Sequence, residues 1–279
     1  MIRLIIDSTC DLDSNLISKF KIDVVPLQVI VNGHSYKDKF EMSVETLYDH
    51  IRNSDDVKTS LPAYDDIAPI FEKYAKENQP FIFISFAKAL SGTNNFANIL
   101  VKELQEKYST QMAVVDSKNG GLATAMMVED ILDFMQKHDN FDEIVNFSNE
   151  LAAQMHHVIM LDDLTQLRKG GRISAIKSVI SSVLSIKPVL KLDQGYIKHH
   201  KNGIGKKRAL IELVNYVEAN SKDKNTVIGV NYSANEELLN DVLNLLAQRG
   251  FNHIRKGRIA SVMTAHIGLD AVSLCFLGK

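Results

Sequence analysis

The chain has 279 residues, of which 45% are hydrophobic and 24% charged, with a formal net charge of −2 at pH 7. This size and hydrophobic content allow one large or two medium-sized domains, and we expect two. The nearly neutral charge provides no basic surface of the kind that nucleic acid or an anionic membrane requires, so neither is expected as the main partner.

The first half of the chain alternates short β-rich runs with amphipathic helical segments. In chain order the predicted elements are a strand at Arg3 to Ile6, a short helix at Asn15 to Phe20, an extended segment at Val24 to Val31, helices at Val44 to Arg52 and Ala63 to Glu77, a strand at Phe81 to Ser85, a helix at Thr93 to Tyr108 and a strand at Met112 to Val115. Strand, loop and helix in rotation are typical of an α/β domain with a parallel sheet and helices on both faces.

The second half begins with helices at Gly121 to His138 and Asp142 to Met155 and then carries mostly strands. The strands are predicted at Val158 to Leu161, Lys187 to Leu192, Tyr196 to Lys201, Val227 to Tyr232, His253 to Lys256, Ser261 to His266 and Val272 to Leu277, with helices at Lys207 to Ala219 and Glu236 to Gln248. Asp193-Gln194-Gly195 is a hairpin-type connection, which makes its flanking strands antiparallel. We therefore predict a second, α+β layer domain with a largely antiparallel sheet, and domains at residues 1–157 and 158–279.

The cysteines and the length of the apolar runs indicate in which cellular compartment the protein is expected. Cys10 and Cys275 lie at opposite ends of the chain without the spacing of a disulfide framework, which fits a reducing compartment. The first residues lack a basic segment followed by a long apolar one, and no apolar run approaches the roughly 20 residues that span a bilayer. We expect a cytoplasmic protein without stable membrane insertion.

The most informative segment is FIFISFAKALSGTNNFA at 81–97, where an apolar strand ends in a loop and a helix begins near Ser91-Gly92-Thr93. Ligands of open parallel sheets bind beyond the carboxyl ends of the strands. Gly92 lets a backbone approach closely, the first amides of the helix favour an anion, and Ser91 and Thr93 add hydroxyl donors. A simple helix N-cap at Ser91 or Thr93 explains the same residues equally well.

Three other polar turns carry similar chemistry: Asp7-Ser8-Thr9, Thr59-Ser60 and Asp116-Ser117. Those that follow strands of a parallel sheet open on one edge, which gathers hydroxyl groups into one crevice. Asp7 and Asp116 are candidate pocket acids, although ordering a turn is the commoner role for such residues.

A basic loop and one histidine complete the candidates. Arg168, Lys169 and Arg172 surround a Gly-Gly pair that ends one helix, and Ser174 is placed to cap the next. The loop suits guiding a carboxylate or phosphate, docking an acidic partner, or only an exposed helix end. His266, at the end of a predicted strand, suits a headgroup contact because imidazole both donates and accepts hydrogen bonds, but a structural histidine is commoner.

Several catalytic patterns are missing. The sequence contains no GxSxG, no complete GxxxxGK[ST], no GxGxxG after a strand, no HExxH and no CxxC. The histidine pairs at 156–157 and 199–200 are adjacent rather than at metal-ligand spacing. We therefore predict no metal, no catalytic residue and no cofactor.

Taken together, these segments resemble the DegV family, which includes the fatty-acid-binding (FakB-type) subunits of bacterial fatty acid kinase. The resemblance covers nearly the whole chain. The segments that carry it are IIDSTCDL near the N-terminus, Val25-Pro26-Leu27, Thr59-Ser60 with Pro62, Leu90-Ser91-Gly92-Thr93, Val115-Asp116-Ser117, Lys169-Gly170-Gly171-Arg172-Ile173-Ser174, Ile186-Lys187-Pro188-Val189-Leu190, Gly195, Lys207-Arg208 and His266.

The resemblance implies a three-layer α/β/α N-terminal domain, a second α/β domain, and a long-chain fatty acid held between them. It implies that one set of residues holds the carboxylate: Thr59, Ser60, Ser91, Gly92, Thr93 and His266. Arg172 would help present the headgroup to a kinase subunit, which supplies ATP and forms an acyl phosphate. The chain departs from the family pattern at Leu61, at Asn94 and at Leu269-Asp270.

The leading hypothesis is thus a fatty-acid-binding protein that presents its ligand to an ATP-dependent kinase subunit and performs no catalysis alone. One alternative is a stand-alone phosphotransferase or hydrolase that uses Asp7, Ser91 or His266 on a small anionic substrate. Another is a regulatory module whose loop from Arg168 to Arg172 binds a protein.

Overall fold

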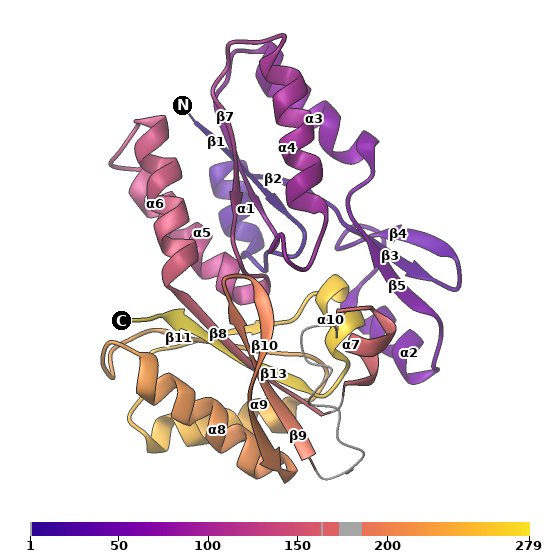
Figure 1. The fold of residues 1–279 in the computed structure, drawn as a ribbon, viewed down its shortest axis with the longest axis vertical. Coiled ribbons are helices and arrows are strands. Elements are labelled where there is room, and N and C mark those ends of the chain that lie inside the picture. The colour runs from indigo at the N-terminus through magenta and orange to yellow at the C-terminus, as the bar shows by residue number, and fades with distance from the viewer. Residues whose placement is uncertain (1, 163, 173–185) are drawn as a thin grey trace.

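The computed structural model describes residues 2–162, 164–172 and 186–279. Figure 1 shows two bodies, one above the other, with a small third sheet beside the junction. The upper body is built on a parallel sheet and the lower body on a mostly antiparallel one. This agrees with the predicted fold class.

The first sheet has four parallel strands in the order β2-β1-β6-β7. The strands are β1 (Arg3–Asp7), β2 (Asp23–Val25), β6 (Phe81–Ser85) and β7 (Met112–Asp116), and the helices of this body are α1 (Ser14–Phe20), α3 (Tyr64–Lys76), α4 (Thr93–Gln105), α5 (Gly121–Met135) and α6 (Phe141–Gln154). All four strands point the same way, so their carboxyl ends meet at one edge.

Helices cover both faces of this sheet because its strands are apolar on both sides. Ile5 and Phe83 pack on one face in the cluster that includes the buried side of α3 and α4. Ile6 and Ile84, next along the same strands, pack on the other face with α5 and α6. Successive side chains of a strand point to opposite faces. The three-layer α/β/α prediction is therefore confirmed.

The extended segment predicted at 24–31 is divided between two sheets. β2 ends at Val25, and β3 (Gln28–Val31) begins a three-stranded antiparallel sheet in the order β4-β3-β5. Its other members are β4 (His34–Lys37) and β5 (Val57–Ser60), with helix α2 (Val44–Arg52) beside it. Pro26 separates the two strands because proline has no N–H for the ladder. The sequence did not predict β4, β5 or this sheet.

The last sheet has six strands in the order β10-β9-β8-β13-β11-β12, and only β11 and β12 run parallel. Its elements are β8 (Met155–Leu161), β9 (Ile186–Asp193), β10 (Tyr196–Ile204), α8 (Gly205–Asn220), β11 (Ile228–Tyr232), α9 (Glu236–Gln248), β12 (Ile254–Arg258) and β13 (Ala271–Leu277). Asp193 pairs with Tyr196 across the predicted hairpin, which is thus confirmed. The expected domain boundary at 157/158 falls within β8 and stays a prediction.

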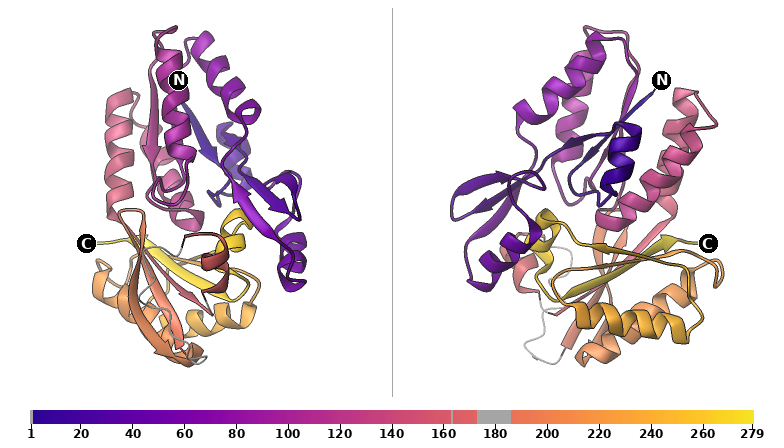
Figure 2. Two further views of the ribbon diagram at one scale, coloured as in Figure 1. Left: turned by 45° about the vertical axis from the view of Figure 1, so that its right-hand side comes forward. Right: turned by 180° about the vertical axis from the view of Figure 1, so that it is seen from behind.

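Among the described residues, helices α8 and α9 cover one face of this six-stranded sheet. Val158, Met160 and Val230 pack against those helices. The opposite face, which carries His157, Ile159 and other alternating residues, is turned toward the first body, as Figure 2 makes visible.

The strand predicted at Ser261 to His266 is wrong, because this segment is helix α10 (Ser261–Ile267). Val262 and Ala265, three positions apart, lie on one helical face and pack into the core of the small sheet. Seven residues are too few for periodicity to distinguish helix from strand. The short helix α7 (Thr165–Lys169) packs against α10 and ends at Gly170, as the Gly-Gly pair predicts. Ser174 lies outside the described residues.

Candidate functional site

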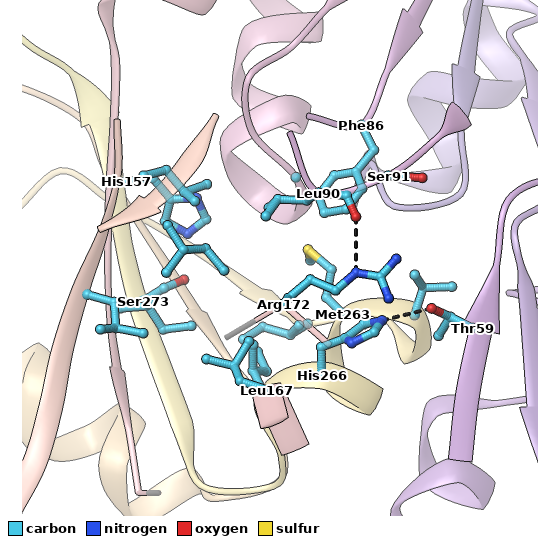
Figure 3. Close-up of a pocket in the computed structure, with 18 of the residues that line it drawn as sticks. Thr59, Phe86, Leu90, Ser91, His157, Leu167, Arg172, Met263, His266 and Ser273 are labelled. Carbon is cyan, nitrogen blue, oxygen red and sulfur yellow. Dashed lines mark hydrogen bonds between the residues drawn. The ribbon is translucent and has the colours of Figure 1, made fainter. Parts of the chain in front are cut away.

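A cavity of about 280 Å³ lies where the three sheets meet. Its walls come from the ends of β5 and β6, the open face of the six-stranded sheet, and helices α7 and α10. Most of the lining is apolar: Leu27, Leu61, Phe86, Leu90, Ile159, Leu161, Leu167, Leu190, Leu192, Ile197, Ile259, Val262, Met263 and Ile267. Figure 3 shows these walls closing around an interior space. Such a cavity suits a flexible hydrocarbon.

Thr59 and His266 form a polar pair on one wall. Thr59 lies near the carboxyl end of β5 and His266 in the last turn of α10, and their Oγ1 and Nε2 atoms are 2.7 Å apart. Figure 3 shows this pair on the side of the cavity away from the six-stranded sheet. Ser60, also predicted, lines the cavity beside Thr59. The sequence suggested a turn here, whereas the hydroxyls lie on a strand.

The imidazole of His266 is neutral at physiological pH. Burial, and secondarily the positive charge of Arg172, lowers the pKa of His266 to about 4. A neutral ring carries one N–H and one acceptor nitrogen. Its Nδ1 has no hydrogen-bond partner among the described residues, and the backbone of Gly170 lies directly against that nitrogen. The ring is therefore held between Gly170 and Thr59.

The Ser91 loop brings a second hydroxyl to the cavity. Ser91 and Gly92 line it, and Gly92 is the N-cap residue of α4. The Ser91 hydroxyl is 2.9 Å from Thr93 Oγ1 and accepts a 3.2 Å hydrogen bond from the Thr93 amide. Thr93 itself is fully buried and is not part of the lining, so it orients Ser91. The N-cap position itself is Gly92, so the alternative of an N-cap at Ser91 or Thr93 is wrong, whereas Ser91 both lines the cavity and accepts a hydrogen bond from the first amide of the helix.

Arg172 connects the end of α7 to the loop after β6. Its Nε donates to the Leu90 carbonyl at 3.2 Å, and one terminal nitrogen donates to the Gly170 carbonyl at 2.6 Å. In Figure 3 the guanidinium lies between Leu90 and the Thr59–His266 pair. A fixed positive charge therefore stands at the polar wall, among the predicted carboxylate-binding residues.

The two acids considered from sequence lie outside the cavity lining. The Asp7 carboxylate accepts hydrogen bonds from the Thr9 amide, the Thr9 hydroxyl and the Phe86 amide. Asp116 accepts from the amides of Lys88 and Lys118 at 3.1 and 2.9 Å. Both order the loops at the carboxyl edge of the parallel sheet, which is the turn-ordering role described above.

Four polar residues that the sequence did not single out also line the cavity: His157, Lys191, Asn231 and Ser273. All four belong to strands of the six-stranded sheet, and His157, Asn231 and Ser273 lie on its open face. Because successive side chains of a strand point to opposite faces, the sequence of β8 and β13 could have indicated which residues share this face. It could not have indicated that a cavity lies above them. Phe86 and Met263, which the sequence also did not single out, line the cavity. In Figure 3 they lie between the six-stranded sheet and the Thr59–His266 pair.

The departures from the family pattern have visible places in the structure. Leu61 lines the cavity next to Gly92 and is 39% exposed, so it adds apolar surface at the rim. Asn94 is buried, and its amide donates to Ser85 Oγ at 2.8 Å. After Gly268 the chain turns away, and the Leu269 carbonyl accepts hydrogen bonds from Ser233 and Ala234.

Within the described residues there is no group of three or more His, Cys, Asp or Glu side chains that could hold a metal ion. Across the same residues, no helix is both long and apolar enough to cross a membrane. The polar side chains that line the cavity among the described residues are hydroxyls, an amide, two imidazoles with lowered pKa values and two cationic groups.

The structure resembles several solved ones over its full length. A fatty acid binding DegV family protein from Streptococcus agalactiae matches with a TM-score of 0.91 at 24% identity, covering 100% of this chain and 99% of that one. The Streptococcus pneumoniae Fatty Acid Kinase (Fak) B3 protein, loaded with linoleic acid, matches with a TM-score of 0.86 at 18% identity, covering 100% of both chains. At these identities the likeness establishes the fold.

Sequence comparison agrees. A DegV domain-containing protein of Staphylococcus aureus (strain N315) is 29% identical over an alignment of 286 positions, which covers 99% of this chain and 98% of the relative. A second, from Clostridium perfringens, is 26% identical over 278 residues, or 99% of this chain and 98% of the relative. The family model described as an uncharacterised protein of the DegV family matches residues 1–279. The chain therefore belongs to the DegV family.

Proposed function

We propose that this protein binds a long-chain fatty acid in the cavity and presents its carboxylate to a partner kinase that forms an acyl phosphate. The observation that carries the proposal is that the cavity has a largely apolar lining and, at one side, a polar wall with Thr59, His266, Ser91 and Arg172. Related structures described as fatty acid binding, or loaded with linoleic acid, support the choice of ligand.

The acyl chain supplies most of the affinity in this proposal. Each buried methylene contributes about 0.8 kcal/mol, so roughly twelve methylenes contribute on the order of 10 kcal/mol before the entropic cost of association. Leucine, isoleucine, phenylalanine and methionine side chains line the space in which the chain would lie. These side chains place no charge along most of the path, which favours a hydrocarbon over a polar metabolite.

The polar wall fixes the acidic end. A buried carboxylate is costly unless it receives hydrogen bonds. Neutral His266 can donate from Nε2 to Thr59 Oγ1, which leaves the Thr59 hydroxyl proton free to donate to the ligand. Ser60, Ser91 and the Gly92 amide would add donors, Thr93 would orient Ser91, and Arg172 would offset the negative charge. In this arrangement the headgroup contacts set orientation and specificity.

The proposed role involves no catalytic residue of this chain. The kinase subunit would supply ATP and transfer the phosphoryl group, this chain would contribute the bound fatty acid rather than a cofactor, and the reaction would take place in the bacterial cytoplasm. Arg172, at the junction of α7 and the Leu90 loop, would help present the headgroup to that partner. The carboxylate oxygen would form a bond to the γ-phosphorus of ATP while the bond to the β-phosphate oxygen breaks, which gives an acyl phosphate and ADP.

Extraction of purified protein with organic solvent, followed by mass spectrometry, tests the ligand directly. We expect a fatty acid at close to one equivalent per chain. Protein that is repeatedly free of fatty acid and fails to take it up from solution would refute the proposal. Turnover of a small anionic substrate by the isolated chain would instead support the stand-alone enzyme.

A pair of variants at Thr59 tests the headgroup. Thr59→Val keeps the shape of the side chain and removes its hydroxyl, whereas Thr59→Ser keeps the hydroxyl. Losing one hydrogen bond to a charged group costs about 1.5–3 kcal/mol, so we expect Thr59→Val to bind fatty acid about tenfold to a hundredfold more weakly. Thr59→Ser should stay within a few-fold of the native protein. Equal affinities for the two variants would exclude Thr59 from the site.

A further inference from the structure

The wall of the cavity opposite the headgroup pair is not purely apolar. His157 on β8 and Ser273 on β13 line the cavity, and Figure 3 shows them on the far side from Thr59 and His266. Their residues are 9% and 1% exposed, respectively. Two polar side chains are therefore enclosed at the place where a bound acyl chain would run.

Neither side chain has its hydrogen-bonding capacity used. His157 Nδ1 is buried and has no partner among the described residues. His157 Nε2 and the Ser273 hydroxyl take part in none of the hydrogen bonds found among the described residues, and both side chains line the cavity. An unsatisfied buried polar group costs about 1–3 kcal/mol. A polar group on a bound molecule would supply the hydrogen-bond partner that His157 and Ser273 lack within the described chain.

The strand register places these groups within reach of one another. Ser273 pairs with Ile159, and His157 lies two residues before Ile159 on the same face of β8. Diagonal neighbours of this kind have side chains about 7–8 Å apart, which leaves room for one small polar group between them. Asn231 pairs with Ser273 on the other side, and its buried Oδ1 also has no partner among the described residues.

The protonation state of His157 defines what would fit. Burial lowers the pKa of His157 to about 4, so its ring is neutral at physiological pH and offers one donor and one acceptor. A hydroxyl group also offers one donor together with acceptor capacity. A carboxylate has no donor, so it would satisfy these residues less completely than an alcohol.

We infer that the cavity is adapted to an acyl chain that carries a hydroxyl group, which hydrogen-bonds to His157 and Ser273 at a distance from the carboxylate. The inference deepens the proposed function and rests on it. Because the two polar sites lie on opposite walls, the hydroxyl must be placed along the chain and not beside the acid. The substrate class is thus a hydroxy fatty acid.

A positional series of monohydroxystearic acids, with stearic acid as the reference, tests this in a competition assay on delipidated protein. In an entirely apolar cavity a buried hydroxyl without partners weakens binding on the order of tenfold. We expect one position of the hydroxyl to bind at least as tightly as stearic acid and the other positions to bind about tenfold more weakly. Every isomer binding much more weakly than stearic acid would overturn the inference.

Variants identify the residue responsible. His157→Leu should lower the affinity for the best isomer relative to stearic acid by about tenfold, and Ser273→Ala should lower the same ratio by a smaller factor. The matched control is His156→Leu: His156 belongs to the same strand, but its ring stacks on Phe276 outside the cavity lining. An unchanged ratio of the two ligands in His157→Leu would also overturn the inference.

The stearic acid arm separates this inference from the function on which it rests. If stearic acid binds and no hydroxyl position is favoured, the fatty-acid proposal stands and the hydroxyl site is wrong. If neither stearic acid nor any isomer binds, both are wrong. The native protein alone gives this result, so the test does not depend on the folding of any variant.

Discussion

Replacing Gly170 with alanine should loosen the headgroup site without changing any residue that contacts the ligand. A Cβ at Gly170 would lie 2.0 Å from His266 Nδ1 and 2.7 Å from His266 Cε1. Ordinary contact for such atoms is about 3.5 Å, so the overlap is about 1.5 Å. The ring cannot slide forward, because His266 Nε2 is already 2.7 Å from Thr59 Oγ1. It must swing away, which breaks the Thr59 contact.

Two effects of comparable size follow. Overpacking of this kind costs about 1–3 kcal/mol in the free energy of unfolding. Loss of the Thr59–His266 hydrogen bond, which orients the Thr59 hydroxyl toward the carboxylate, removes about 1 kcal/mol from binding, or roughly a fivefold loss of fatty acid affinity. Gly170 has φ −75°, so alanine introduces no backbone strain there and the collision is the cause of both effects.

The neighbouring glycine supplies the control. Gly171 has φ +74°, and a Cβ there meets nothing within 4 Å. Gly171→Ala should therefore cost about 1–2 kcal/mol of stability through backbone strain but leave affinity unchanged. Denaturant unfolding and displacement of a fluorescent fatty acid, both on delipidated protein, measure the two quantities. Native affinity in Gly170→Ala, or an equal loss in Gly171→Ala, would show that Gly170 does not hold the His266 ring against Thr59.

Three further predictions concern the same cavity. Ser91→Ala removes a hydroxyl from the cavity and the hydrogen-bond acceptor of the Thr93 amide. It should weaken fatty acid retention about fivefold without unfolding the protein. Unchanged retention in extraction experiments would exclude Ser91 from the site. Arg172→Ala, loaded at a saturating concentration of fatty acid, should lose phosphorylation by the kinase partner, measured as acyl phosphate formed, and full activity would contradict the presenting role. Burial lowers the pKa of His157 in the folded protein from its ordinary value of 6.5 to about 4. The unfolded chain therefore takes up the proton first as pH falls, and stability is lost between pH 6.5 and 4. From pH 7.5 to 5 the native protein should lose about 2 kcal/mol more than His157→Leu; a pH-independent difference in their unfolding free energies would be inconsistent with a buried neutral ring.

The parallel sheet and its ligand edge could be predicted because each strand carries its own signal. Phe81–Ser85 is an unbroken apolar run, and the loop after it supplies Ser91 and Gly92 at the place where such sheets bind ligands. The small sheet could not be predicted in this way. β4 reads His-Ser-Tyr-Lys and has no buried residue, so its pairing with β3 leaves no apolar alternation in the sequence.

The error at α10 has the same origin. Ser261–Ile267 is rich in residues that suit strands, and it becomes a helix because Val262 and Ala265 can pack on the small sheet. His266 then reaches Thr59, which is 207 positions away along the chain. The sequence named both residues through a family resemblance, but their hydrogen bond depends on the position of a helix that local periodicity did not reveal.

The two kinds of sheet, the three layers of the first body and the polar loop at Ser91 could be predicted from the amino-acid sequence, because each strand, helix and turn carries its own local pattern of apolar and polar residues. That Thr59, His266 and Arg172 share one wall, and that His157 and Ser273 face a cavity instead of a packed core, is visible only in the folded structure. Alternation along a strand assigns side chains to two faces, but what covers each face depends on distant segments. The chemistry of this site arises from that long-range packing.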